Sequence, residues 1–321
     1  MPIRQKFLSL TLAISFLFIS SSGWAQLDHS LEGEMVHIPS GHFIFGTNKK
    51  DESAEALSMG IPKPWYADER PRQKIFLKGF YIDTFEVTNE RYKKYVDTIG
   101  AVPPGNWKDN DYAAGKDKEP VTWVTWFDAA NFCQWAEKKL PTEKQWERAA
   151  KGTDGNEYPW GNKFQPDIAH LSTRAGSKNK PLAVGSFPKS ASKEGVHDLI
   201  GNVWEWVADD YQPYKDSTHK NDFYNMGYKI LRGHSASDIG HFPMYANAIK
   251  MFARSGYRQF ANPDEPGPDV GFRCASENKP KATKTGLTLL DQPVNSSTTT
   301  SNIEKPALPK AATKTSAPFN P

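Results

Sequence analysis

The chain of 321 residues lacks an apolar stretch that could serve as a permanent membrane anchor. Its apolar run, residues 7–19, is too short to span a bilayer, and no cysteine follows it to take a lipid. Arg4 and Lys6 precede this run, and small residues follow it up to Ala25. That order is typical of a secretory signal, so we expect residues 1–25 to be removed and the product to be secreted or periplasmic.

The central part of the chain also has no excess of basic residues. The formal net charge is +3, but the signal contributes +2 and residues 279–321 contribute +4, which leaves −3 for residues 26–278. A nucleic-acid partner is therefore not expected. Residues 279–321 are rich in Lys, Thr, Ser, Pro and Ala and nearly lack aromatic residues, so we expect them to be disordered. Residues 26–278 have a length that suits one folded domain.

Cysteine is scarce, because Cys133 and Cys274 are the only two in the chain. An even number in an exported protein favours one disulfide between them, and two buried free thiols are the alternative. A disulfide would close a long loop and could add roughly 4 kcal/mol of stability in the chain-entropy model.

Turn-forming and aromatic residues are abundant: the chain has 10 Trp, 23 Gly and 24 Pro. Long regular elements should therefore be few. Alternating apolar residues predict four short strands in residues 35–83, and no internal repeat or coiled-coil heptad is found. The predicted helices are residues 88–96, residues 126–139 capped by Thr125, and a third that starts at Thr142 with a capping box. After Gly152 the periodicity fades, which predicts loops and short strands.

Several segments in the central part of the chain form a recognisable series. They include "MVHIPSGHFIFGT", "PVTWVTWFDAANFCQWAEKKLPTEKQWERAAKG", "YPWGN", "GVHDLIGNVWEWVADDY", "LRGHS" and "VGFRCA". Read in order, they resemble the formylglycine-generating-enzyme, or sulfatase-modifying factor, family over about residues 33–276. The resemblance implies an α+β, C-type-lectin-like fold with little regular secondary structure, and it implies that Cys133 pairs with Cys274.

The stretch from Asp198 to Glu205 is the candidate metal site. Calcium prefers six to eight oxygen ligands, which a tight loop can supply from carboxylates and backbone carbonyls. The resemblance implies a structural calcium ion held by the side chains of Asp198 and Glu205 and the carbonyls of Gly201 and Val203. In the alternative interpretation Asp198 caps a turn and Glu205 makes an ordinary hydrogen bond.

The cysteine pair of the family's active enzymes, which follows an "RGGS" motif and binds copper, is missing here. Asp238 stands about where the first cysteine would be, so copper is not expected, since Cu(I) prefers thiolates. His234, Asp238 and His241 could form a replacement metal or acid/base site. The interpretation we favour is a surface loop with solvated side chains.

Three arginines, Arg232, Arg254 and Arg258, could line a cleft. Arginines near strand ends more often pair with carboxylates, and we expect such pairs for these three.

These observations support an exported sulfatase-modifying-factor-like protein without formylglycine-generating activity. It would bind a peptide, protein or small molecule in the family's cleft, or act as a maturation factor. The alternative is a divergent periplasmic oxidoreductase that acts on a secondary metabolite or a respiratory-enzyme partner. Formylglycine formation by another route is the least favoured hypothesis.

Overall fold

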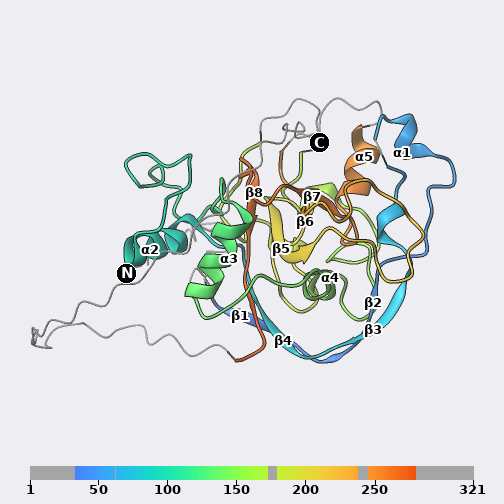
Figure 1. Cartoon of the computed structure of the whole chain (residues 1–321), viewed down its shortest axis with the longest axis horizontal. Helices are drawn as coiled ribbons and strands as arrows, with labels where there is room; N and C mark the ends of the chain where they lie inside the picture. The colour runs from blue at the N-terminus through green and yellow to red at the C-terminus, as the bar shows by residue number, and fades with distance from the viewer. Residues whose placement is uncertain (1–32, 62, 173–178, 238–244, 280–321) are drawn as a thin grey trace, which may run out of the picture.

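Three small sheets organise the part of the chain that the computed structural model describes, namely residues 33–61, 63–172, 179–237 and 245–279 (Figure 1). The first sheet has the strand order β1-β4-β9, and the second consists of β2 and β3. The third has the order β7-β6-β5-β8. The strands are β1 (Met35–Ile38), β2 (Gly41–Phe45), β3 (Gln73–Leu77), β4 (Phe80–Asp83), β5 (Trp204–Asp210), β6 (Lys229–Arg232), β7 (Gln259–Ala261), β8 (Val270–Phe272) and β9 (Ala275–Ser276).

The four-stranded sheet lies at the centre of the described part, and β5 is one of its two inner strands. β5 pairs antiparallel with β6 and parallel with β8. Trp206 of β5 stands opposite Phe272 of β8, and both side chains are fully buried. Because β5 begins directly after the loop of residues 198–203, the sheet fixes the position of that loop.

Helices begin at the residues that the capping signals predicted. Thr125 and Asp128 form one capping box, and Thr142 and Gln145 form another. Thr88 caps the first long helix by accepting a hydrogen bond from the Arg91 N–H. The α-helices are α1 (Glu55–Ser58), α2 (Asn89–Ile99), α3 (Trp126–Trp135), α4 (Glu143–Lys151) and α5 (Tyr245–Phe252); short 3₁₀ turns are η2 (Ala67–Glu69), η3 (Pro166–Ile168) and η4 (Pro188–Ser190).

Three expectations about helices were wrong. The first long helix continues to Ile99 rather than ending at residue 96. The second long helix ends at Trp135 rather than at residue 139, since Glu137 adopts a left-handed backbone with φ of 57°. The helix α5 was missed in a region expected to hold only loops and short strands. Its buried residues Ala248, Ile249, Met251 and Phe252 do lie at helical spacing, but eight residues are too few for this spacing to predict a helix.

An aromatic cluster and the disulfide together fasten α3 to the end of the central sheet. The Phe132 ring lies 5.5 Å from that of Tyr92 and 5.4 Å from that of Phe272, measured between centroids. The next residue, Cys133, forms the expected disulfide with Cys274, and both are fully buried. The crosslink therefore reinforces a contact that apolar packing already makes.

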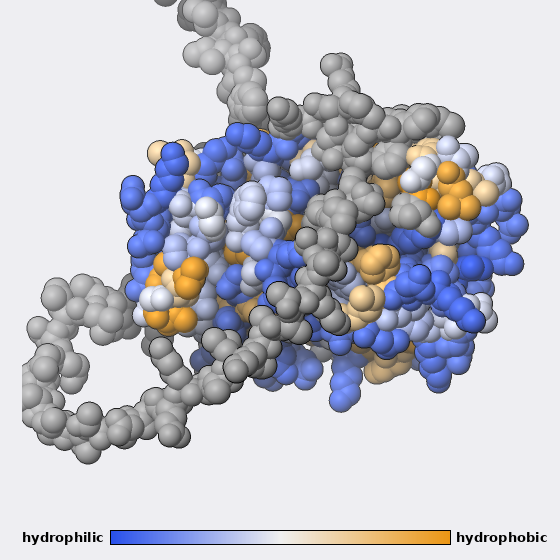
Figure 2. Space-filling model, turned by 45° about the horizontal axis from the view of Figure 1, so that its top comes forward, coloured by the Kyte–Doolittle hydropathy of each residue, from blue (hydrophilic) through white to orange (hydrophobic). Residues whose placement is uncertain are grey.

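One face of the described part is mostly polar. Figure 2 shows that hydrophilic residues predominate on this face and that apolar residues form small separate patches. None of the helices in the described residues combines the length and the apolarity needed to cross a membrane.

Replacing both cysteines, as Cys133→Ala/Cys274→Ala, should lower the free energy of unfolding by about 5 kcal/mol in the chain-entropy model. The reason is that the crosslink joins residues 141 positions apart and restricts the unfolded chain. Urea denaturation of both proteins, with and without a reductant, measures the effect. The reductant should destabilise the wild type and leave the variant unchanged, and a variant as stable as the oxidised wild type would contradict the expectation.

Candidate metal and ligand site

The loop between Asp198 and Glu205 has a backbone that few sequences could adopt. Asp198 and Asn202 both have left-handed conformations, with φ of 54° and 60°. Gly201 has a φ of 91°, and a Cβ atom there would lie 2.4 Å from the His170 carbonyl oxygen. Glycine is therefore required at position 201, because this close approach fixes the path of the loop.

Both predicted carboxylate ligands are buried and already have partners. Asp198 accepts a hydrogen bond of 2.5 Å from the Gly185 N–H. Glu205 accepts two hydrogen bonds of 2.7 Å from the Arg273 guanidinium and one of 2.9 Å from the Trp146 indole. The ordinary hydrogen bonds of the alternative interpretation are thus present, although a carboxylate has lone pairs for further ligands.

A third carboxylate, Glu86, lies at the same place and was missed from the sequence. Its side chain is fully buried, and its Oε1 atom has no hydrogen-bond partner among the described residues. Its Oε2 atom accepts only a long bond of 3.4 Å from the Asn202 amide. A signal for it was present in the sequence, because Glu86 lies between the apolar residues Phe85 and Val87. An acidic residue in such a buried stretch needs a partner for its charge.

The electrostatics of the cluster show an excess of negative charge. Burial raises the pKa of Glu86 well above its usual range, and the nearby Asp198 carboxylate raises it further. Burial also raises the pKa of Asp198 to about 6, although the Gly185 N–H and the Arg273 guanidinium oppose this shift. Three buried carboxylates share one guanidinium, and this arrangement favours either protonation or an additional cation.

The candidate ligands at this loop are all oxygen atoms, which are the ligands that a hard cation such as calcium prefers. In the described part of the chain, no three His, Cys, Asp or Glu side chains converge closely enough to hold a metal ion by themselves. An ion at this loop would therefore need backbone carbonyls, such as those of Gly201 and Val203, in addition to side chains.

The segment that follows β6 is buried at its start. Gly233 has a φ of 96°, and a Cβ there would lie 2.8 Å from the Leu199 carbonyl oxygen. His234 packs between Trp204 and Phe252, with ring centroids 5.1 and 5.8 Å away. The surface-loop interpretation is thus wrong for His234, which is fully buried. Asp238 and His241 lie outside the described residues, so their proposed role stays a prediction.

His234 is also an unusual buried imidazole. Neither ring nitrogen has a hydrogen-bond partner among the described residues. Burial lowers its pKa to about 3, so the ring is neutral at physiological pH. The neighbouring Ser235 hydroxyl donates a 2.7 Å hydrogen bond to Asp269, which anchors the segment beside the ring.

Comparison with known proteins assigns the fold. Residues 25–278 match the sulfatase-modifying factor enzyme 1-like domain. The chain belongs to this family. It is 30% identical to the inactive C-alpha-formylglycine-generating enzyme 2 of Mus musculus, over 85% of this chain and 96% of the relative. It is 26% identical to the formylglycine-generating enzyme of the same species, over 78% and 76%.

A solved structure agrees with this assignment. PvdO from Pseudomonas aeruginosa superimposes with a TM-score of 0.56 at 25% identity, covering 76% of this chain and 94% of that one. The expected α+β fold of the sulfatase-modifying factor family is therefore confirmed.

The buried arginines of this sulfatase-modifying factor protein pair with carboxylates, as expected. Arg232 bridges Glu143 and Glu147, with N–O distances of 2.7 Å to each. Arg258 also contacts Glu143 at 2.7 Å. Likewise, Arg254 forms a two-pronged ion pair with Glu69, at 2.6 and 2.7 Å. These three guanidinium groups are paired with buried carboxylates, so removing one partner would leave a buried charge uncompensated.

The buried imidazole predicts a pH effect on stability. Folded His234 takes up a proton only near pH 3, whereas the unfolded chain does so near pH 6.5, so the unfolded state binds more protons between these values. Through this residue alone, a change from about pH 6.5 to about pH 5 should lower the free energy of unfolding by about 2 kcal/mol. His234→Asn should remove this contribution, because Asn does not titrate and tolerates the left-handed backbone.

Urea denaturation of both proteins at the two pH values measures this difference. The comparison is needed because the raised pKa values of Glu86 and Asp198 act in the opposite direction, favouring the folded state as the pH falls. The exposed His42, replaced as His42→Asn, serves as the control. An equal loss of stability in wild type and His234→Asn would show that the imidazole does not act as described.

Proposed function

We propose that this protein is an exported member of the sulfatase-modifying factor family that does not make formylglycine. It binds a peptide, protein or small-molecule ligand, or acts as a maturation factor, through the surface that the active enzymes use for their substrate. One observation carries the proposal: Cys133 and Cys274 are joined in a buried disulfide, and the chain has no other cysteine. No thiolate is left to bind Cu(I) or to exchange with a substrate cysteine.

One further observation supports it. A relative that covers 85% of this chain is named an inactive formylglycine-generating enzyme. Export rests on the composition of residues 1–25, which lie outside the described residues. The absence of a membrane-spanning helix among the described residues is compatible with a secreted or periplasmic product.

A peptide that contains the cysteine of a sulfatase motif should not be oxidised by the purified protein. The reason is that the chemistry of the active enzymes needs two free thiols, and both sulfurs here are crosslinked. Mass spectrometry of the peptide after incubation with copper and oxygen measures aldehyde formation. An active formylglycine-generating enzyme is the positive control. Copper-dependent turnover, or a reactive thiol in the native protein, would falsify the proposal.

We also propose that a structural calcium ion is bound by Asp198, Glu205 and the carbonyls of Gly201 and Val203, with Glu86 as a further ligand. The support is the excess of buried negative charge and the unpartnered Glu86 Oε1 atom. The ion would supply the positive charge that Arg273 alone does not. Since the loop leads into β5, the bound ion would also stabilise the position of Trp204 beside His234.

Glu86→Gln should weaken calcium binding by about tenfold or more, which is the effect of losing one charged ligand. Thermal unfolding in calcium and in a chelator measures it. In the chelator the variant should be at least as stable as the wild type, because it no longer buries a repelled carboxylate. The exposed Glu52, replaced as Glu52→Gln, is the matched control. Equal responses to calcium in wild type and Glu86→Gln would contradict this ligand set.

The second candidate function is a divergent oxidoreductase acting on a secondary metabolite or a respiratory-enzyme partner. It is favoured by the neutral His234 imidazole, since unprotonated ring nitrogens are common metal ligands. Elemental analysis separates the two candidates. A stoichiometric redox metal that is lost in His234→Asn supports the oxidoreductase, whereas calcium alone supports the binding protein.

A further inference from the structure

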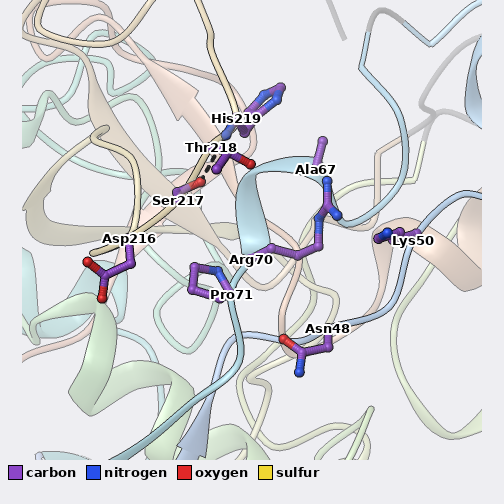
Figure 3. A pocket seen from close by; sticks show the side chains of 9 residues that line it. All are labelled: Asn48, Lys50, Ala67, Arg70, Pro71, Asp216, Ser217, Thr218 and His219. Atoms are coloured by element: carbon purple, nitrogen blue, oxygen red, sulfur yellow. Dashed lines mark hydrogen bonds between the residues drawn. The ribbon is translucent and has the colours of Figure 1, made fainter.

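A cavity of about 220 Å³ lies between three segments that are far apart in sequence (Figure 3). We call it the Arg70 pocket. It shares no residue with the loop of residues 198–205 or with the segment of residues 233–237. The residues used in the argument are Asn48, Lys50, Arg70, Asp216, Thr218 and His219.

Arg70 differs from the other half-buried and buried arginines of the described chain. Its guanidinium has no carboxylate partner among the described residues, and its Nε atom is buried without an acceptor. A buried donor that lacks an acceptor is costly, so its presence indicates that something else supplies one. The arginines that do pair with a carboxylate are Arg91, Arg148, Arg232, Arg254, Arg258 and Arg273.

Two further groups add positive or hydrogen-bonding character to the cavity. His219 also lines the cavity, and in Figure 3 its ring points away from the Arg70 guanidinium. The exposed Lys50 lines the same cavity, and in Figure 3 the Arg70 guanidinium points toward Lys50 and Ala67. The one acidic lining residue, Asp216, lies beyond Pro71 from the guanidinium in the same view. The Thr218 hydroxyl group can donate or accept at the same cavity.

The walls of the pocket are fixed before any ligand arrives. A Cβ on Gly46 would lie 2.6 Å from the Glu69 carbonyl oxygen, so the two segments pack backbone against backbone. The Thr47 N–H donates to the Glu69 carbonyl at 2.9 Å. The Arg72 N–H donates to the Asn48 side-chain oxygen, also at 2.9 Å. Little ordering of these segments is needed on binding, which favours affinity.

We infer that the Arg70 pocket binds a compact oxyanion, a phosphate, sulfate or carboxylate group, through the fork of the Arg70 guanidinium, with Lys50 as a further donor. The planar guanidinium matches such groups with two parallel hydrogen bonds, whereas an ammonium group offers a point charge. The anion supplies the acceptor that the buried Arg70 Nε atom lacks. The site is independent of the proposed function, because neither the disulfide nor the calcium loop takes part in it.

Thermal unfolding and calorimetric titration of the full chain test the inference. The probes are inorganic phosphate, sulfate and acetate, each titrated at constant ionic strength against chloride. We expect saturable stabilisation with one site per chain, and Arg70→Gln should weaken the affinity about tenfold or more. Arg72→Gln is the matched control, since this exposed arginine carries the same charge two residues away and does not line the pocket.

A second variant keeps the test decisive if Arg70→Gln does not fold. Lys50→Ala changes an exposed side chain and should weaken phosphate binding about threefold or more, in line with the loss of one partly exposed charge. The inference is overturned if none of the three anions binds saturably. It is also overturned if Arg70→Gln, or Lys50→Ala in its place, binds phosphate as tightly as Arg72→Gln.

Discussion

The buried ion pair between Glu205 and Arg273 is the interaction on which the rest of the structure depends. The two side chains are fully buried and joined by two hydrogen bonds of 2.7 Å. Arg273 also donates to the carbonyls of Asp83, Thr84 and His197, so one guanidinium ties the end of β4 and the entrance of the loop of residues 198–203 to the central sheet. A buried pair costs much desolvation free energy, and these extra hydrogen bonds offset it.

The charge of this ion pair does not balance the other carboxylates around it. Glu86 and Asp198 bring two more carboxylates to this site, where the Arg273 guanidinium lowers the pKa of both but does not offset the effect of burial. A cation bound at the loop would balance this charge and hold the start of β5 in place. Trp204, the first residue of β5, contacts His234, so the charge balance at the loop and the environment of the imidazole are linked through one strand.

The disulfide links two parts of the fold and leaves neither of its sulfur atoms free for thiol chemistry. Cys133 and Cys274 join α3 to the end of the sheet beside the packed rings of Phe132 and Phe272. In a chain with two cysteines, that crosslink leaves no sulfur for catalysis. The family scaffold is thus retained while the group that defines the activity of its enzymes is missing, as expected when function resides in the site rather than in the fold.

Local features of this protein were determined by its sequence. Helix starts at Thr125 and Thr142 followed from capping boxes, because the groups that cap a helix lie within three residues of each other. Family motifs gave the fold and the pairing of the two cysteines. Only the tertiary structure placed Glu86 beside Asp198, buried His234 and left Arg70 without a carboxylate partner among the described residues. Burial and charge balance at these positions depend on segments distant in the chain, which no local pattern encodes.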